Sequence, residues 1–488
     1  MLKKIGLFLF SNQTTGQIVV KNTLWLTVSN VVGNLLRLVI VIYAARLLGA
    51  AEYGLFSYAI SIVAIFAIIS DLGLNSLISI NIVQREKVGQ LYFSTLVFLR
   101  FILVFITIIL VIFIGPIITR FAEAKSLIWI ITLLLVFDDT RNFLNNLSRS
   151  ENRNDKDALV TIITNLIILI LCWFGLKYAP TSHTLAIMYL IGSALGTVIT
   201  FIILRKGWFL ILKPFRFSFK LAKDILAIAI PFSLANTMWT IMVNTDIFII
   251  SWLKTPADLG YYAAAQKPVM MLTIIPYVLV VGSLSLMAKL VQEESKERLK
   301  NFIEKLVIFS LAIVLPLVAG GIIIAPSMMN FLYGTEYNSA ILSFQLLLVT
   351  LIITYSSTII GNLVLIYKQQ KYFTIAMILG ALVNVGLDLL LIPSFGIAGS
   401  VIATIGALTM IYGYLWHKVR QILPFKIMPF LPKIIVATCL MGLVTFALNL
   451  VEINFFMNII LSAFVYLGVL IIAREPLLDE LKGLFQSK

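Results

Sequence analysis

Charged residues are scarce in this 488-residue chain, at 12% of the composition, while hydrophobic residues make up 60% and the mean hydropathy is +1.04. Soluble domains carry roughly 25% charged residues, so this composition excludes an ordinary soluble domain and requires lipid as solvent. Cysteine and histidine are also scarce. Cys172 and Cys439 both lie in apolar stretches, which excludes a disulfide framework or thiol metal cluster, and two histidines argue against any metal site. We therefore expect no cofactor and no metal.

Long apolar runs account for most of the chain. Segments 21–46, 56–83 and 91–118 each exceed the ~20 residues that cross a hydrocarbon core, so the chain spans the membrane repeatedly. The pattern predicts an all-α polytopic membrane protein with about fourteen transmembrane helices. The predicted spans are 20–45, 55–82, 91–118, 126–147, 157–178, 184–204, 224–252, 260–289, 302–325, 340–366, 373–393, 397–417, 429–450 and 454–473.

Basic residues outnumber acidic ones, for a net charge of +15. In a soluble protein this excess would indicate nucleic acid. Here nearly all of it falls in alternate loops, most densely in 205–223 and 289–305, and the loops after the ninth, eleventh and thirteenth helices contain neither Lys nor Arg. The positive-inside rule then predicts a cell-membrane protein with both termini cytoplasmic. Attraction to anionic membrane lipids is a secondary interpretation, and no nucleic-acid partner is expected.

A short pattern recurs along the chain. Glu52 and Gly54, after the first span, correspond at one constant offset to Asp258 and Gly260 after the seventh. A weaker echo relates Asn165 to Asn384. These echoes predict two six-helix lobes related by an axis along the membrane normal. The predicted domains are an interfacial segment 1–19 with a short helix near residues 5–10, an N-lobe 20–204, a basic cytoplasmic linker 205–223, a C-lobe 224–420, and two further helices with a cytoplasmic tail, 421–488.

Polar side chains line one face of several spans. The first span carries Thr23, Thr27, Asn30, Asn34 and Arg37 at helical spacing, and comparable stripes in the second and seventh spans include Asp71 and Asn244. Such a face needs water or polar partners in a membrane. Interhelical hydrogen bonding is one interpretation, favoured for the Ser and Thr members. A shared hydrated cavity, lined by Asn30, Asn34 and Asn244, is the other.

Two cations inside spans receive a functional interpretation. Arg37 lies nine residues before Arg46, and Lys267 lies seven after Gly260. At ~1.5 Å per residue both sit roughly 10 to 14 Å below the outer helix ends. Two cations at one depth in opposite halves would suit a diphosphate, Arg as a forked donor and Lys as a point charge. The alternative is that each neutralises a local carboxylate.

Three acids, Asp71, Asp246 and Asp388, also lie in spans. They would bind a coupling proton or sodium ion, or else balance the cations; charge balance or helix packing is favoured for Asp71 and Asp246. Asp388 follows Asn384 by one turn, a spacing that suits a cation or a buried hydrogen bond. A local ion-pair cluster is expected from Asp138, Asp139 and Arg141, and Arg100 is expected either to join it or to line the cytoplasmic half of the path. Bending is expected at Pro231, Pro276 and Pro316.

The residues 44–56, AARLLGAAEYGLF, resemble the motif after the first helix of Wzx-type polysaccharide flippases. Further similarities follow in order: Asp71 to Leu74, Pro231 with Asp246, Tyr333 to Tyr337, and Asn384 to Ala403. The resemblance implies membership of the multidrug/oligosaccharidyl-lipid/polysaccharide (MOP) exporter superfamily, with a MATE-like fold of two lobes around a cavity that opens alternately to either side. It also implies a polyprenyl-diphosphate-linked oligosaccharide cargo held by cationic residues of helices 1, 2, 7 and 8. Arg37 and Lys267 match by helix, whereas helix 2 offers no cation.

The function expected from this resemblance is a lipid-linked oligosaccharide flippase for O-antigen, lipopolysaccharide or exopolysaccharide biosynthesis, and not an enzyme. Polysaccharide polymerase or assembly proteins are the expected partners. A cation-coupled drug or metabolite antiporter of the same superfamily is the alternative. A membrane glycosyltransferase, polymerase or O-antigen ligase is disfavoured because every external loop is short, and a purely structural scaffold would not need polar stripes.

Overall fold

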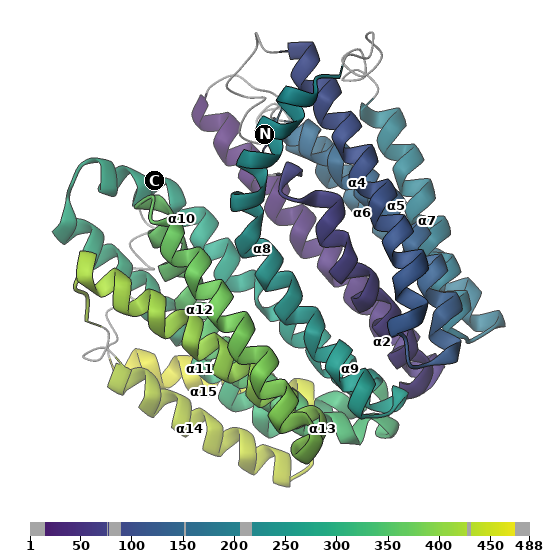
Figure 1. Cartoon of the computed structure of the whole chain (residues 1–488). Coiled ribbons are helices and arrows are strands. Elements are labelled where there is room, and N and C mark those ends of the chain that lie inside the picture. The colour runs from purple at the N-terminus through teal and green to yellow at the C-terminus, as the bar shows by residue number, and fades with distance from the viewer. Residues whose placement is uncertain are drawn as a thin grey trace, which may run out of the picture. The chain divides into compact units, whose positions relative to one another are not determined.

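The computed structural model describes residues 15–75, 77, 89–150, 153–204, 217–426 and 431–473. Every regular element in these ranges is a helix (Figure 1). The helix expected near residues 5–10, most of the basic linker and the C-terminal tail lie outside the described residues.

Ten of the described helical stretches are long and apolar enough to cross a membrane. They comprise α2 (Thr15–Asp71), α4 (Gly89–Ile118), α6 (Asn154–Tyr178), α7 (Ser182–Leu204), α9 (Pro256–Leu272) with α10 (Ile274–Gln292), α11 (Lys296–Tyr333), α12 (Ile341–Ile366), α13 (Gln370–Ile422), α14 (Leu431–Leu450) and α15 (Phe455–Ile472). A further span is α8 (Phe219–Leu253), which bends by 58° between Ile230 and Ser233, where the sequence places Pro231.

The long helix α2 is a hairpin of two spans. Gly49 has φ 73°, a left-handed conformation that glycine adopts without steric cost. Before it, the chain runs along α6: Asn154 Nδ2 donates to the Asn22 carbonyl over 3.4 Å, and the Tyr43 hydroxyl donates to the Trp173 carbonyl over 3.1 Å. After it, the chain turns back along α5 (Ala122–Ser150), where Ser70 Oγ donates to Asp139 Oδ1 over 3.5 Å.

A second hairpin is folded within α13. Gly396 has φ 60°, and the residues on either side of it pack in antiparallel register. A Cβ on Gly399 would meet the Leu391 carbonyl, one on Gly406 would meet Leu387, and one on Gly380 would meet Ile411. Because α2 and α13 each supply two spans, the ten stretches provide twelve, and α8 brings the number of apolar spans in the described residues to thirteen. The helix α5 lies between α4 and α6, where the sequence predicts a fourth span. The predicted polytopic all-α fold is confirmed.

The chain divides into two compact units, Met1–Ala263 and Ala264–Lys488. The lobe limits predicted from the sequence remain a prediction. In the second unit, α14 and α15 pack on each other and on α11.

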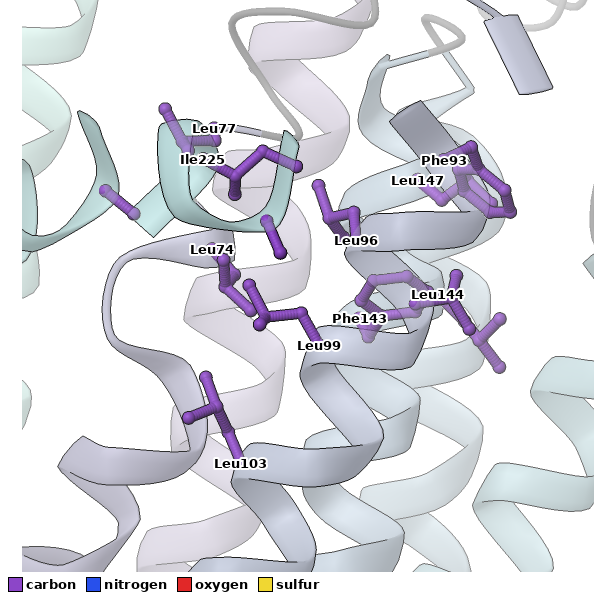
Figure 2. Close-up of a cluster of buried hydrophobic side chains, with 13 residues drawn as sticks. Leu74, Leu77, Phe93, Leu96, Leu99, Leu103, Phe143, Leu144, Leu147 and Ile225 are labelled. Atoms are coloured by element: carbon purple, nitrogen blue, oxygen red, sulfur yellow. The ribbon is translucent and has the colours of Figure 1, made fainter. Parts of the chain in front are cut away.

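An apolar cluster in the first unit joins the residues just after α2 to α4, α5 and α8 (Figure 2). Leu74, Leu96, Phe143 and Ile225 are among its buried side chains. Between Asp71 and this cluster the helix breaks, with φ +37° at Leu72 and +85° at Gly73. A Cβ on Gly73 would come within 2.5 Å of the Ala229 carbonyl oxygen, so glycine is needed there both for its backbone conformation and for space.

Prolines in the second unit leave carbonyls that other helices satisfy. A proline lacks the N–H that would bond to the carbonyl four residues earlier. For Pro276 that carbonyl is Leu272, and it accepts a 2.8 Å hydrogen bond from the Tyr355 hydroxyl. In α11, Pro316 frees the Ala312 carbonyl, bonded at 2.7 Å by the Tyr466 hydroxyl of α15. Likewise Pro326 frees the Ile322 carbonyl, which accepts from Gln345 Nε2 over 2.9 Å.

Candidate functional site

Arg37 is an exposed cation in the middle of the first span of α2, held in place from one side. Its Nε donates to Asn165 Oδ1 of α6 over 3.1 Å, and Asn165 Nδ2 in turn donates to the Thr161 carbonyl over 2.9 Å. Gly33, one turn before Arg37, allows this approach because a Cβ there would lie 3.3 Å from Asn165 Nδ2.

The outer part of the Arg37 guanidinium remains available. Among the described residues, neither Nη atom has a hydrogen bond or an ion pair. A guanidinium fixed at Nε presents both Nη groups as a planar fork, which is the geometry that binds a phosphate or carboxylate with two parallel hydrogen bonds. Asn34 is exposed one turn before Arg37 and Asn30 is half-buried two turns before it, so the polar stripe of this span continues from Arg37 toward the start of α2.

The other predicted cavity residues are distributed over both units. Asn244 in α8 is half-buried, and its Nδ2 donates to the Thr240 carbonyl of its own helix over 2.8 Å. Lys267 in α9 is half-buried and belongs to the second unit. The structure therefore groups Arg37 with Asn30 and Asn34, while Asn244 and Lys267 are placed on helices of their own.

Asp71 takes part in an ion-pair cluster. Arg100 Nη1 donates to Asp71 Oδ1 over 2.7 Å, and its Nε donates to Asp139 Oδ2 over 2.9 Å. Asp71 also accepts the Asn75 backbone N–H over 3.1 Å, which caps the turn after the break at Gly73. Arg100 lies beside the ring of Phe143, so the apolar cluster of Figure 2 adjoins these charges. The predicted association of Arg100 with this cluster is confirmed.

A second ion pair lies nearby on α5. Arg141 Nη2 donates to Asp138 Oδ1 over 2.8 Å, and Asp138 also accepts from Ser193 Oγ of α7. The single cluster predicted for Asp138, Asp139 and Arg141 is therefore divided into two groups, because Asp138 pairs with Arg141 whereas Asp139 pairs with Arg100.

Asp246 and Asp388 are both buried. Asp246 in α8 accepts a hydrogen bond from the Tyr262 hydroxyl. Asp388 and Asn384, one turn apart in α13, are each 0% exposed, and the Asn384 amide has no hydrogen-bond partner among the described residues. An amide and a carboxylate buried at this spacing supply the hard oxygen atoms that alkali cations prefer.

Sequence reasoning did not identify two features of this site. Asn165 appeared only as a repeat echo of Asn384, not as the residue that fixes Arg37. Tyr262 gave no signal as the partner of Asp246. The Arg37–Asn165 contact joins residues 128 positions apart, whereas the Asp246–Tyr262 contact joins the consecutive helices α8 and α9. Neither Asn nor Tyr is unusual in a membrane helix.

Several known proteins resemble this chain in sequence or in fold. A family profile described as "Polysaccharide biosynthesis protein" matches residues 19–284. The chain is 22% identical over 392 residues to the probable low-salt glycan biosynthesis flippase Agl15 of Haloferax volcanii, covering 79% of this chain and 80% of that protein.

Solved structures share the fold. The lipid II flippase MurJ in an inward closed conformation superposes with a TM-score of 0.72 at 17% identity, covering 93% of this chain and 99% of MurJ. An inward-facing multidrug resistance MATE family transporter of the MOP superfamily gives a TM-score of 0.64 at 19% identity, covering 80% and 94%. These likenesses confirm the predicted MATE-like fold. Because the family match extends over more than half of the sequence, the chain belongs to the polysaccharide biosynthesis protein family.

Proposed function

We propose that this protein is a flippase that moves polyprenyl-diphosphate-linked glycans from the cytoplasmic to the outer leaflet for cell-surface polysaccharide biosynthesis. The family and the name of the Haloferax relative support glycan biosynthesis as the setting. The fold shared with the lipid II flippase MurJ supports movement of a lipid-linked cargo, for which we propose alternating access.

Arg37 is the observation that carries the proposal. A charge in the middle of an apolar span costs several kcal/mol unless it is paired or hydrated, so such residues mark substrate or ion pathways. Arg37 is exposed, its Nε is anchored by Asn165, and its Nη groups have no partner among the described residues. A guanidinium held in this way is preorganised for an anionic headgroup that enters the membrane, and a diphosphate is such a group.

Lys267, a half-buried point charge on α9, is proposed as a further cation for the phosphoryl groups of the cargo. Asn30, Asn34 and Asn244 would hydrogen-bond to sugar hydroxyls in a hydrated path, while the prenyl chain stays in lipid. Both termini are proposed to be cytoplasmic, as the basic loops indicate, with membrane lipids and polysaccharide assembly proteins as neighbours.

Asn384 and Asp388 support a coupling cation. Their complete burial in α13 makes an ionised carboxylate costly unless a counter-charge accompanies it. A bound sodium ion or proton would supply that charge, and its release would couple ion movement to the opening of the protein. The same observation is what favours the alternative function, a cation-coupled drug or metabolite antiporter, because the MATE transporter shares the fold.

Proteoliposomes distinguish the two functions. The cargo is a polyprenyl-diphosphate oligosaccharide on the outer leaflet, and its appearance inside is read from protection against an impermeant glycosidase, with and without a sodium or proton gradient. A flippase gives protection well above that of protein-free vesicles. An antiporter gives no protection with any glycan, but exchanges a cationic dye against the imposed gradient.

A further inference from the structure

Arg37 belongs to a set of charged side chains in the first unit whose acids pair with other arginines. Two carboxylates, Asp71 and Asp139, share the single cation Arg100. Arg141 pairs with Asp138, and Asp157 is paired with Arg149 over 2.7 Å. Arg37 has no ion pair among the described residues. The four acids are thus balanced by four arginines, but all four acids pair with Arg100, Arg141 and Arg149, and Arg37 is left without a carboxylate within ion-pair distance among the described residues.

The Arg141 guanidinium is buried although one of its hydrogen-bond donors has no partner among the described residues. Its residue is 6% exposed, Nη2 reaches Asp138, and Nη1 has no hydrogen-bond partner among the described residues. Asp138 is 40% exposed at its side chain and also accepts from Ser193, so its charge is shared and partly hydrated. A buried guanidinium with an unmet donor favours any arrangement that brings an acceptor or an opposite charge to it.

Arg149 of α5 pairs with Asp157 of α6 over 2.7 Å, which sets the antiparallel register of these two helices. Eight residues back along α5 and eight forward along α6, the same register places Arg141 opposite Asn165, the residue that holds Arg37. Arg37 is fixed by Asn165, eleven residues from the start of α6, and Arg141 precedes the end of α5 by nine residues. At ~1.5 Å per residue these positions lie roughly 14 to 17 Å from the neighbouring ends of the two helices, and so at similar depth. Like charges at close range in a weakly polar medium repel, and an anion between or beside them relieves that repulsion.

We propose that Arg37 and Arg141 together form an anion subsite for a phosphoryl group, in which Arg37 makes the direct contact through its free Nη groups and Arg141 supplies the second positive charge from α5. The proposal rests on the proposed function for the identity of the cargo, and it adds Arg141 of α5 to the cations Arg37 and Lys267. The whole subsite then lies within one unit of the protein and does not require Lys267.

Binding is tested apart from transport. Purified full-length protein in phosphatidylcholine nanodiscs is titrated with farnesyl diphosphate, with farnesol as the uncharged control. Wild type is expected to bind the diphosphate at least tenfold more tightly than farnesol. Arg37→Gln and Arg141→Gln are each expected to weaken diphosphate binding about tenfold without changing farnesol binding, and the double variant to be hardly weaker than either single variant, since the two side chains serve one site.

Three variants separate charge from structure. Arg46→Gln removes an exposed arginine of the same span, nine residues from Arg37, and is expected to bind as wild type. Arg141→Lys retains the charge and is expected to keep most of the affinity. Arg141→Gln with Asp138→Asn removes the ion pair without leaving a lone carboxylate, so it is expected to fold and still to bind weakly.

Unchanged diphosphate affinity in folded Arg141→Gln overturns the proposal, as does an Arg141→Lys protein as weak as Arg141→Gln, which would indicate a packing role. If phosphatidylglycerol nanodiscs abolish diphosphate binding by competition, the subsite takes bilayer phosphates rather than cargo, and the assignment to cargo is overturned. Failure of glycan transport with intact, arginine-dependent diphosphate binding would contradict the proposed function while leaving the subsite in place.

Discussion

Gly54 packs against the backbone one turn before Gly260, and Gly260 packs against the backbone one turn before Gly54. A Cβ on Gly54 would overlap the carbonyl oxygen of Pro256, and a Cβ on Gly260 would overlap that of Ala50. One offset relates Gly54 to Gly260 and Ala50 to Pro256, so the two copies of the sequence repeat meet through equivalent backbone atoms. Such a contact is what a local two-fold relation between the repeats produces.

The acidic residues of the two repeats, Glu52 and Asp258, have equivalent roles. Glu52 Oε2 accepts the Ser182 backbone N–H over 2.8 Å at the start of α7, and Asp258 Oδ2 accepts the Thr255 backbone N–H over 3.0 Å at the start of α9. Each acid caps a helix start, where unpaired N–H groups favour negative charge.

Alanine at either glycine should destabilise the protein. Gly54→Ala or Gly260→Ala forces the two backbones apart, an overpacking that costs about 1 to 3 kcal/mol. Thermal unfolding in detergent measures the loss. Gly282→Ala is the matched control, because a Cβ there would meet nothing within 4 Å, and it should leave the unfolding temperature unchanged or slightly raised. Equal unfolding temperatures for Gly54→Ala and Gly282→Ala would contradict the reciprocal packing.

The contribution to stability of the hydrogen bond from the Tyr355 hydroxyl to the Leu272 carbonyl can be measured by a double-mutant cycle. Tyr355→Phe leaves that carbonyl unpaired and should cost about 1 kcal/mol of unfolding free energy. In a Pro276→Ala background the restored N–H can bond to the same carbonyl, so Tyr355→Phe should cost markedly less. An identical cost in both backgrounds would show that the hydroxyl acts independently of the proline.

Arg100 should be the most sensitive residue of the ion-pair cluster. Arg100→Gln leaves Asp71 and Asp139 close together without a cation, and breaking a buried pair in this way costs roughly 3 to 5 kcal/mol. Adding Asp139→Asn removes one of the stranded charges and should recover a large part of the loss. Expression yield and unfolding temperature report both steps. A double variant no more stable than Arg100→Gln would mean that the cluster acts through packing against Phe143.

Sodium should stabilise the protein through Asn384 and Asp388. A cation that binds only the folded state raises its unfolding temperature with concentration. Replacing choline chloride by sodium chloride at constant ionic strength should therefore raise the unfolding temperature of wild type but not of Asp388→Asn. A sodium effect that persists in Asp388→Asn would assign the ion to another site, and the absence of any effect in wild type would leave a proton as the coupling ion.

The spans were predictable because apolar runs of this length have few other structures available in a membrane. The ion pairs of Asp138 and Arg141 were also foreseeable, since residues three apart share a helix face. The Arg37 to Asn165 bond joins residues 128 positions apart, and the Tyr466 to Ala312 bond joins residues 154 apart. Such partners are set by how helices pack, which depends on small residues such as Gly33 and not on any local pattern.

The most direct test of the central claim is the rate of glycan flipping in proteoliposomes by wild type, Arg37→Ala and Arg46→Ala, with folding verified by unfolding temperature. We predict that Arg37→Ala slows transbilayer movement of the polyprenyl-diphosphate oligosaccharide at least tenfold, while Arg46→Ala matches wild type. Equal rates for wild type and a folded Arg37→Ala would contradict the assignment of Arg37 as the headgroup contact. The absence of movement in wild type with any lipid-linked glycan would contradict the flippase itself.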